Sequence, residues 1–594
     1  MGTFFDDASL VMIPSGVKES KLYSIKPSNG DGDFTFSRGT DTATRVNASG
    51  LIEKERSNQL LQSNSFDTTW VSFNATETSG QSGYDGSNDA WLLQITAASG
   101  SIRQTISASG VQTYSFYAKA GTTDWVAAYV ATGGSAPYCF FDLTNGVKGA
   151  TQNNVIDSSI TDVGGGWYRI ALVFNTTTTD VRIFPAEANA VLASQVGDNI
   201  YIQDAMLNQG LVAQPYIETT TAAVYEGITD NLPRLDYSGG ASCPSLLLEP
   251  SRTNEVEYSE YFDGWIKSNI SVANNVSTSP EGVQNATTID VVSDASFASL
   301  RRNISVSANS TYTMSLFVKK ETSETNYMGL GFIYSGGTTD VGYVIIDSVN
   351  GTAVSADPRI DVITNVVDFG DYWRIEATAT DSGSNTSLAV YIYGTLSTNG
   401  TSVAVGTGST RTIWGAQLEA ASYPTSYIPT MGTSASRAAD VCNKSSATSI
   451  IGQTEGTMFV EAKIDANSTD DYNRIFGISQ GNDSYRIIIF SNDQEKIALN
   501  VKNAAVSQVQ IVSNISPFST FKAAVGYSAN DFVFYINGQQ IGTDSSGTVP
   551  ACDTISLGTH EDGSGTRAIE GNVKQALLFD TRLTNAELAA LTTL

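Results

Sequence analysis

The sequence repeats itself, and this limits the folds open to the chain more than any other feature. The segment "SNSFDTTW", ending at Trp70, returns as "SEYFDGW", ending at Trp265. "SIRQTISASGVQTYSFYAKAG" (101–121) returns as "SLRRNISVSANSTYTMSLFVKKE" (299–321). Three further pairs keep the same order: "FFDLTNG" with "VIIDSVNG", "GGGWYRIAL" with "GDYWRIEAT", and "DAMLNQG" with "GAQLEAA". Ordered matches of this kind indicate a duplicated domain.

Each copy is predicted to consist of β-strands. "TYSFYAKA" and "TYTMSLFVKK" alternate between apolar and polar residues in the manner of half-buried strands. Breaks rich in Gly, Asn and Thr separate short strands, which predicts an antiparallel sandwich or jelly roll. The opening Phe-Asp-x-Trp and the closing "IYIQDAML" or "TIWGAQLE" resemble the first and last strands of carbohydrate-binding-module jelly rolls.

The C-terminal part has another pattern. "GTMFVEAKID", "FVFYINGQQIGTD" and "EGNVKQALLFDTRLTNAELAAL" resemble a concanavalin A-like, laminin-G-like sandwich over about 455–594. Asn537-Gly538 predicts a tight hairpin turn with positive backbone angles. Thr584, with Glu587 three residues later, predicts a capping box on a terminal helix. The expected fold class is all-β, with tandem jelly-roll sandwiches followed by a concanavalin A-like sandwich.

Three phrases join the domains: "FTFSRGTDTATRVNASGLIE" (34–53), "LPRLDYSGGASCPSLLLEPSRTN" (232–254) and "SRAADVCN" (436–443). Together with the jelly rolls they resemble tailed-bacteriophage virion proteins of the head-fibre, tail-fibre and capsid-decoration kind. The predicted parts are an N-terminal virion-docking arm (1–55), a first jelly roll (56–220), a linker (221–254), a second jelly roll (255–440) and the concanavalin A-like domain (441–594).

The composition and net charge of the chain limit the classes of partner that it can bind. The 594 residues contain 60 Asp and Glu against 33 Lys and Arg, a formal net charge of −27. Such a chain repels phosphate backbones and anionic lipid, so we expect no nucleic acid and no membrane insertion. The polar, weakly charged make-up is typical of extracellular or virion proteins, yet no secretory signal is visible. Release by cell lysis, as part of a virus particle, accounts for both observations.

Four single cysteines, at positions 139, 243, 442 and 552, include no C-x-x-C pair. A structural zinc site is therefore not expected, and free buried thiols are favoured over a disulfide. A search for catalytic residues is also negative. The lone histidine, His560, is not preceded by a G-x-S-x-G elbow, and we expect it to be a solvated loop residue. Glu461 and Asp465 do not match the paired-carboxylate motif of concanavalin-like glucanases. We therefore expect no catalytic residues.

Aromatic residues on one predicted strand are candidates for glycan binding. In the strand "DWVAAYV", Trp125 and Tyr129 share one face with Ala127, while Val126, Ala128 and Val130 share the other. An aromatic strand face can stack on sugar rings, and the second copy has Tyr327 where the first has Trp125. The alternative is that these residues pack against a neighbouring domain or subunit. Five further tryptophans recur with the scaffold and are expected to pack in cores or at strand edges: Trp70, Trp167, Trp265, Trp373 and Trp414.

Acidic loops could hold calcium through oxygen ligands. Candidates are "SNGDGDF" with Asp31 and Asp33, "GYDGSND" with Asp85 and Asp89, and "STDDYN", although none has EF-hand spacing. The resemblance to carbohydrate-binding-module jelly rolls, which often carry a structural calcium ion, allows a calcium site here. Solvated turns without a metal ion are the favoured expectation.

We therefore expect a non-enzymatic virion protein on the particle exterior, contacting capsid, portal, tail or baseplate proteins and host-surface glycans. The alternative is a carbohydrate-active depolymerase with accessory binding modules. Apolar residues of the arm, among them Leu10, Met12 and Leu22, would stay exposed on a lone chain. This predicts docking of the arm on the particle and a homo-oligomer, with a trimer favoured.

Overall fold

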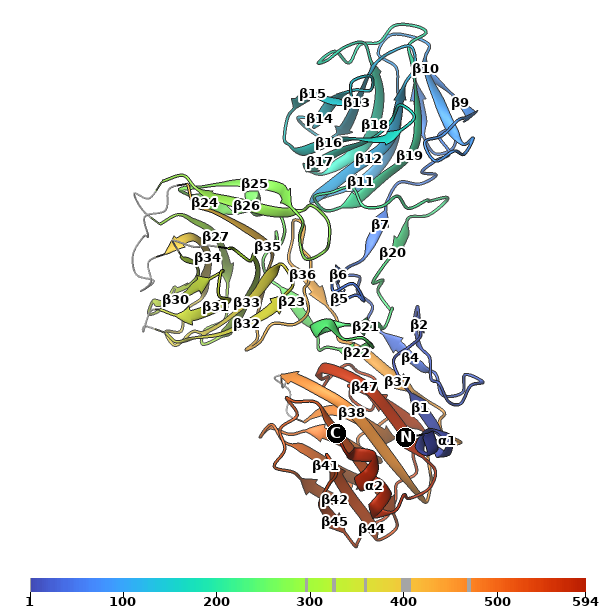
Figure 1. Cartoon of the computed structure of the whole chain (residues 1–594), viewed down its shortest axis with the longest axis vertical. Helices are drawn as coiled ribbons and strands as arrows, with labels where there is room; N and C mark the ends of the chain where they lie inside the picture. Colours follow the sequence, from blue (N-terminus) through green and yellow to red (C-terminus); the bar gives the residue numbers. More distant parts are fainter. Residues whose placement is uncertain (1, 294–296, 323–326, 357–359, 397–407, 467–471) are drawn as a thin grey trace.

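The chain folds into three β-sandwich lobes (Figure 1). The computed structural model describes residues 2–293, 297–322, 327–356, 360–396, 408–466 and 472–594. The described residues form strands almost throughout, with short α-helices only at the two ends of the chain, α1 (Gly2–Asp7) and α2 (Asn585–Thr592). The all-β fold class is confirmed.

The first jelly roll packs two six-stranded antiparallel sheets. One sheet has the order β16 (Val155–Gly164), β17 (Trp167–Asn175), β12 (Val111–Ala120), β19 (Asn199–Gln209), β10 (Ala90–Ile95), β9 (Ala75–Gln81). The other has the order β15 (Val147–Gln152), β14 (Tyr138–Asp142), β13 (Trp125–Ala131), β18 (Thr178–Ala186), β11 (Ser101–Ala108), β8 (Val71–Phe73).

The second jelly roll repeats this plan, as the duplication predicts. Its sheets run β25 (Ile270–Ser277), β26 (Ala286–Val291), β35 (Thr410–Glu419), β28 (Thr311–Lys319), β33 (Tyr372–Thr380), β32 (Val362–Phe369), and β24 (Ile266–Ser268), β27 (Ser299–Ser305), β34 (Ser387–Leu396), β29 (Tyr327–Ser335), β30 (Asp340–Asp347), β31 (Thr352–Ser355). Strands β12 and β28, predicted to be half-buried, are buried on both faces for most of their length. Both are central strands, and residues following the last strand cover them; the Thr113 hydroxyl donates to the Gly210 carbonyl.

The C-terminal sandwich also contains strands from the N-terminal arm and from the linker. One sheet has the order β21 (Arg234–Asp236), β22 (Ser245–Leu248), β47 (Glu570–Phe579), β38 (Glu455–Ala466), β43 (Phe521–Ser528), β44 (Asp531–Ile536), β45 (Gln539–Asp544), with β1 (Leu10–Met12) also pairing with β47. The other has the order β2 (Val17–Lys18), β3 (Lys21–Leu22), β4 (Phe34–Ser37), β37 (Val441–Lys444), β46 (Thr554–Leu557), β39 (Asn473–Ser479), β40 (Arg486–Ser491), β41 (Ile497–Asn503), β42 (Val506–Val512).

Strands β1 to β4 of the arm and β21 and β22 of the linker therefore belong to the C-terminal domain, and the expectation that the arm's apolar residues are exposed on a lone chain is wrong. Leu10, Met12 and Leu22 are buried in the main core of that domain beside Leu246 and Leu248 of the linker. In Figure 1 the N-terminal helix lies in the same lobe as the C-terminus. Each jelly roll is thus an insertion into one sandwich, and the arm's apolar residues no longer argue for an oligomer.

A two-stranded ribbon closes the base of each jelly roll. β7 (Arg56–Asn58) pairs with β20 (Val224–Glu226), and β23 (Arg252–Asn254) pairs with β36 (Ala435–Arg437). A third short ribbon, β5 (Arg45–Val46) with β6 (Ile52–Glu53), lies within the arm. The described residues also form two short 3-10 turns, η1 (Ser238–Gly240) and η2 (Phe262–Gly264).

Two local predictions are confirmed and one needs correction. Thr584 and Glu587 form the capping box of α2, and Asn537 and Gly538 both have positive φ between β44 and β45. All four cysteines are free, but Cys243 is exposed rather than buried. Among the tryptophans, Trp373 is partly buried and packs against the second core, as the prediction of core or strand-edge packing allows.

Candidate glycan-binding faces and a charged junction

The outer face of strand β13 carries the predicted aromatic residues of the first jelly roll. Trp125 and Tyr129 are partly exposed, while Val126, Ala128 and Val130 are buried in the core. The predicted division between two faces is therefore confirmed. Ala127 lies between the two rings and has no exposed surface, which shows how closely its neighbours surround it.

Neighbouring strands extend this face with aromatic residues that the sequence did not single out. The Tyr129 ring stacks on Tyr138 of β14, with centroids 5.3 Å apart, and meets Phe184 of β18 edge-on at 5.6 Å. Tyr138 in turn contacts Phe140 at 5.8 Å. The guanidinium of Arg182 lies over the Tyr129 ring, 5.3 Å from its centroid. We call this surface the first aromatic face.

The strand register continues the first aromatic face to the sheet edge. On β8, Val71 and Phe73 are 51% and 57% exposed and pair with Arg103 and Ser101 of β11. One row of outward side chains crosses adjacent strands in the order Val71, Arg103, Arg182, Tyr129 and Tyr138. Strands lie about 4.8 Å apart, so Arg103 and Tyr138 are about 14 Å apart across the sheet. This is the span of a short oligosaccharide.

Tyr327 holds the same position in the second jelly roll that Trp125 holds in the first. Trp125 pairs with Asp142, and the register of Met328 with Ile346 brings Tyr327 beside Asp347. Asp142 and Asp347 accept equivalent hydrogen bonds, from Asn145 and Asn350 at 2.9 and 2.8 Å. This register supports the proposed equivalence of Trp125 and Tyr327 in the two copies.

The outer face of the second jelly roll has a different set of rings. Tyr391 and Tyr393 of β34 stack with centroids 5.4 Å apart, and Tyr343 of β30 meets Tyr393 at 5.9 Å. A Cβ on Gly331 would come within 2.7 Å of the Tyr393 ring, so this glycine makes room for the ring. The tyrosines, with Arg301 of β27, form the second aromatic face.

The acidic side chains of two candidate calcium loops accept hydrogen bonds from other groups of the protein. Asp33 accepts from Lys21 and from the Ser24 amide at 2.9 and 3.0 Å. Asp85 and Asp89 are bridged by Ser87 and by the Gln203 amide nitrogen. The acidic residues of "STDDYN" lie outside the described residues.

In the part of the chain that the structure describes, a single group of three potential metal ligands occurs: Asp483, His560 and Glu561. Arg474 and Arg486 donate to Glu561 at 3.0 and 3.2 Å. Two guanidinium groups beside the same carboxylate disfavour a divalent cation there. The expectation of a solvated His560 is also corrected, since its side chain is only 12% exposed and faces Glu561 and Asp562.

Glu461 and Asp465 do not form a catalytic pair on their own. Glu461 accepts from Gln575 at 2.8 Å and lies 3.7 Å from the Lys574 ammonium, whereas Asp465 pairs with Lys463. Both lie on strand β38, which bulges on either side of Ile464.

The three joining phrases meet in a buried network of charges. Arg38 follows β4, Arg234 lies on β21, and Glu249 follows β22, while Arg437 and Asp440 come from the last phrase; all five are at most 5% exposed. Arg234 pairs with both acids, Arg38 with Asp440 at 3.3 Å, and Arg437 with Glu249 at 2.9 Å. The phrases are therefore parts of one junction and not independent linkers.

The pKa values at the junction follow from burial and from these pairs. Burial alone would raise the pKa of Glu249, but Arg234 and Arg437 outweigh it and hold that pKa well below its usual range. Burial, together with the neighbouring Glu249, raises the pKa of Glu570 well above its usual range. Glu249 is therefore a carboxylate at pH 7, whereas Glu570 keeps its proton to a higher pH than an ordinary glutamate.

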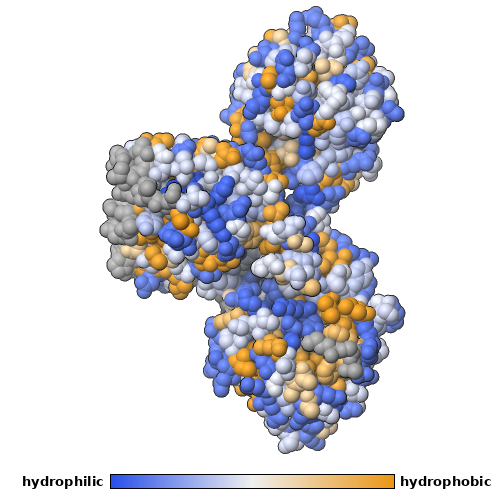
Figure 2. Space-filling model, in the orientation of Figure 1, coloured by the Kyte–Doolittle hydropathy of each residue, from blue (hydrophilic) through white to orange (hydrophobic). Residues whose placement is uncertain are grey.

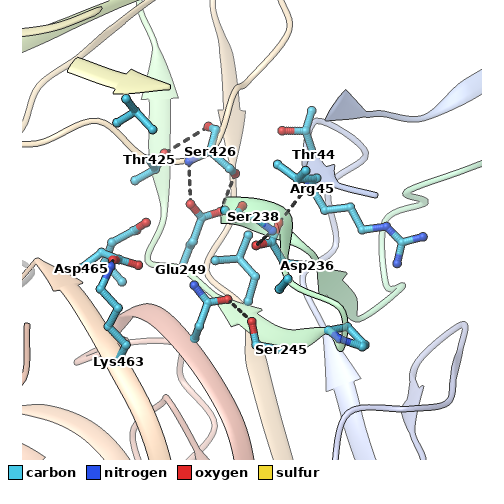
Figure 3. A pocket seen from close by; sticks show the side chains of 18 of the residues that line it. Thr44, Arg45, Asp236, Ser238, Ser245, Glu249, Thr425, Ser426, Lys463 and Asp465 are labelled. Carbon is cyan, nitrogen blue, oxygen red and sulfur yellow. Dashed lines mark hydrogen bonds and ion pairs between the residues drawn. The ribbon is translucent and has the colours of Figure 1, made fainter. Parts of the chain in front are cut away.

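A cavity of about 1100 Å³ opens beside this junction, between the second jelly roll and the C-terminal domain (Figure 3). Glu249 lies in its wall and accepts from the Ser426 amide and hydroxyl, both at 2.6 Å. Opposite, Lys463 and Asp465 project from β38. Figure 2 shows hydrophilic residues gathered in blue where these two lobes meet.

Comparison with known proteins identifies one region. Residues 443–589 match the concanavalin A-like lectin/glucanases superfamily. Among curated proteins, none matches the sequence. No helix in the described residues is long and apolar enough to span a membrane.

Three solved structures are similar to parts of the chain. The Ruminococcus gnavus IT-sialidase CBM40 bound to α2,3 sialyllactose is 14% identical, with a TM-score of 0.23, over 25% of this chain and 86% of that chain. A pentraxin from Limulus polyphemus is 17% identical, with a TM-score of 0.20, over 23% and 69%. The CBM22 tandem of Paenibacillus barcinonensis Xyn10C is 11% identical, with a TM-score of 0.19, over 65% and 98%. The sheet topology and the match over residues 443–589 make this a multi-sandwich chain with a concanavalin A-like C-terminal domain.

Proposed function

We propose that the chain is a non-catalytic glycan-binding protein whose two jelly rolls present aromatic sheet faces to carbohydrate. One observation carries the proposal. In both copies the same sheet exposes rings on its outer side, centred on Trp125 and Tyr129 in the first and on Tyr343 and Tyr391 in the second. Aromatic rings held on a rigid sheet offer apolar planes with polar edges, which suits the faces of sugar rings.

Binding to immobilised polysaccharides tests this proposal. We expect the wild type to be retained. The double substitution Trp125→Ala with Tyr129→Ala should lower the affinity of the first jelly roll for polysaccharide at least about tenfold, since stacked rings dominate such sites. Trp70→Phe, in the buried core, is the matched control and keeps affinity. Equal retention of the double variant would contradict the role of the first aromatic face.

We further propose that this glycan-binding chain is a structural component of a tailed-phage particle, attached to other virion proteins and turned toward host-surface glycans. The sequence resemblance of the joining phrases and the strongly acidic, β-rich make-up support this. Gold-labelled antibody against the chain should mark the outside of intact particles. Label confined to lysate debris would contradict the virion role and leave glycan binding standing.

A depolymerase is the alternative, and one observation favours it. Glu570, whose pKa is raised by burial and by the neighbouring Glu249, lines the interdomain cavity together with Asp465, and a glycosidase needs an acid and a base on two carboxyl groups. The cavity lies away from both aromatic faces, and Asp465 is engaged by Lys463. We expect no release of reducing sugar from any polysaccharide that the chain binds. Release that Glu570→Gln abolishes would establish the enzyme instead.

A further inference from the structure

The two aromatic faces share one charged residue, an arginine at the same place in each copy. Arg103 lies in "SIRQTIS" on β11 and Arg301 in "SLRRNIS" on β27. The register places Arg103 opposite Arg182 and Arg301 opposite Tyr391, each beside the rings of its own face. The rings themselves changed position between the copies, but this arginine did not.

Neither arginine is neutralised by a carboxylate among the described residues. Arg103 is exposed, with no hydrogen-bond or ion-pair partner there. Its neighbour Arg182 pairs with Asp180, 3.0 Å from Nη2 to Oδ2, and this pair leaves Arg103 unengaged. Arg301 donates to the Tyr391 hydroxyl at 3.4 Å and lies 5.9 Å from the centre of that ring. Each face therefore keeps one guanidinium that no carboxylate among the described residues engages.

These guanidinium groups are local positive charges, since the whole chain carries a formal charge of −27. An anionic polymer is repelled by most of such a surface, so it gains from contact only where a positive group is provided. A guanidinium presents a planar fork of donors that matches a carboxylate, and these charge-assisted hydrogen bonds are about twice as strong as neutral ones. The arginines lie in line with rings that can stack on the sugar.

We propose that both aromatic faces recognise acidic glycans, with Arg103 and Arg301 each holding the carboxylate of a uronic or related acidic sugar. This rests on the proposed glycan binding and names its ligand class. On the first face the chain of sugars runs across the strands, from Arg103 toward Tyr138, over the row described above. The two faces belong to one chain, so an acidic polymer that reaches both gains in apparent affinity.

The test uses acidic bacterial polysaccharides and the same polymers after chemical reduction of their carboxyl groups to neutral alcohols. Affinity electrophoresis of the full chain measures binding to both forms. We expect wild type to bind at least one acidic polymer about tenfold more tightly than its reduced form. Arg103→Gln with Arg301→Gln should remove this difference, so that the variant binds the acidic and the reduced polymer equally.

The control is Arg56→Gln, which removes an arginine of the basal ribbon outside both faces and should keep the preference. Melting curves of all variants establish that they are folded. Equal binding of a polymer before and after reduction, or a preference that survives in the double arginine variant, would overturn the inference while the proposed function stands. Absence of binding to every polymer would overturn both.

Discussion

At the residue scale, the buried junction is what the sequence could not reveal. Arg38, Arg234 and Arg437 stand in phrases that look like polar connections, and their partners Glu249 and Asp440 are remote from at least one of them in sequence. Charged residues are almost never fully buried unless paired. Only the three-dimensional meeting of the phrases supplies the pairs, so the sequence showed them only as segments that join domains.

Breaking this network should be costly. Arg234→Met leaves Glu249 and Asp440 buried with fewer partners, and removing one member of a buried ion pair costs about 3 to 5 kcal/mol of unfolding free energy. Arg56→Met, which removes the solvent-exposed pair with Glu226, should cost under about 1 kcal/mol. Chemical denaturation followed by tryptophan fluorescence measures both. Equal, small losses would mean that the junction contributes no stability.

A second residue-scale prediction concerns pH. Burial, and then the nearby Asp89, raises the pKa of Asp204 to about 7. The folded state therefore holds a proton that the unfolded state has lost above its ordinary pKa of about 3.9. Stability of the first jelly roll should fall as pH rises toward about 7, by at most about 1.4 kcal/mol per pH unit from this group. Melting of Asp204→Asn from pH 4 to 8 should show a flatter profile, and an identical profile would contradict it.

At the scale of elements, the duplication predicted more than any single strand did. It gave two copies, their order and the equivalence of Trp125 with Tyr327, because a repeated pattern of apolar residues specifies the same sheet twice. It did not give strand order across each sheet, so Tyr138 and Phe184 were missed although "YCFFD" and "VRIFPA" both contain aromatic residues. Register alone brings them beside Tyr129.

The similar segments "KERSN" (54–58) and "PSRTN" (250–254) end in asparagines that have the same structural role in the two copies. Asn58 and Asn254 end equivalent strands and are fully buried. Asn254 donates to the carbonyls of Ala416 and Ile428 and accepts from the amides of Val256 and Leu418, and Asn58 makes the corresponding four bonds. Each asparagine fastens the start of a jelly roll to its last strand.

Asn254→Ala should therefore destabilise the second jelly roll by about 2 to 4 kcal/mol, since several buried backbone groups lose their partners. Asn29→Ala, at an exposed loop position, is the control and should change little. Hydrogen exchange of the second jelly roll measures the difference. Unchanged protection of β35 in Asn254→Ala would show that these bonds are dispensable.

At the scale of the whole molecule, the chain is one sandwich with two insertions. The arm was expected to be exposed because its partner strands lie hundreds of residues later, a separation that local patterns do not bridge. Leu10→Ala should cost the C-terminal domain about 2 to 5 kcal/mol. Ile25→Ala, half-exposed in the same arm, should cost under about 0.5 kcal/mol. Calorimetry that finds the two equal would contradict the integration of the arm.

The central claim is that glycan is held on the outer faces of the jelly rolls. Hydrogen–deuterium exchange of the full chain, with and without a saturating bound polysaccharide, tests this most directly. We predict slower exchange in β13, β14 and β18, and in β29, β30 and β34, with no change in the opposite sheets. Protection confined to the C-terminal domain, or to strands lining the interdomain cavity, would contradict it.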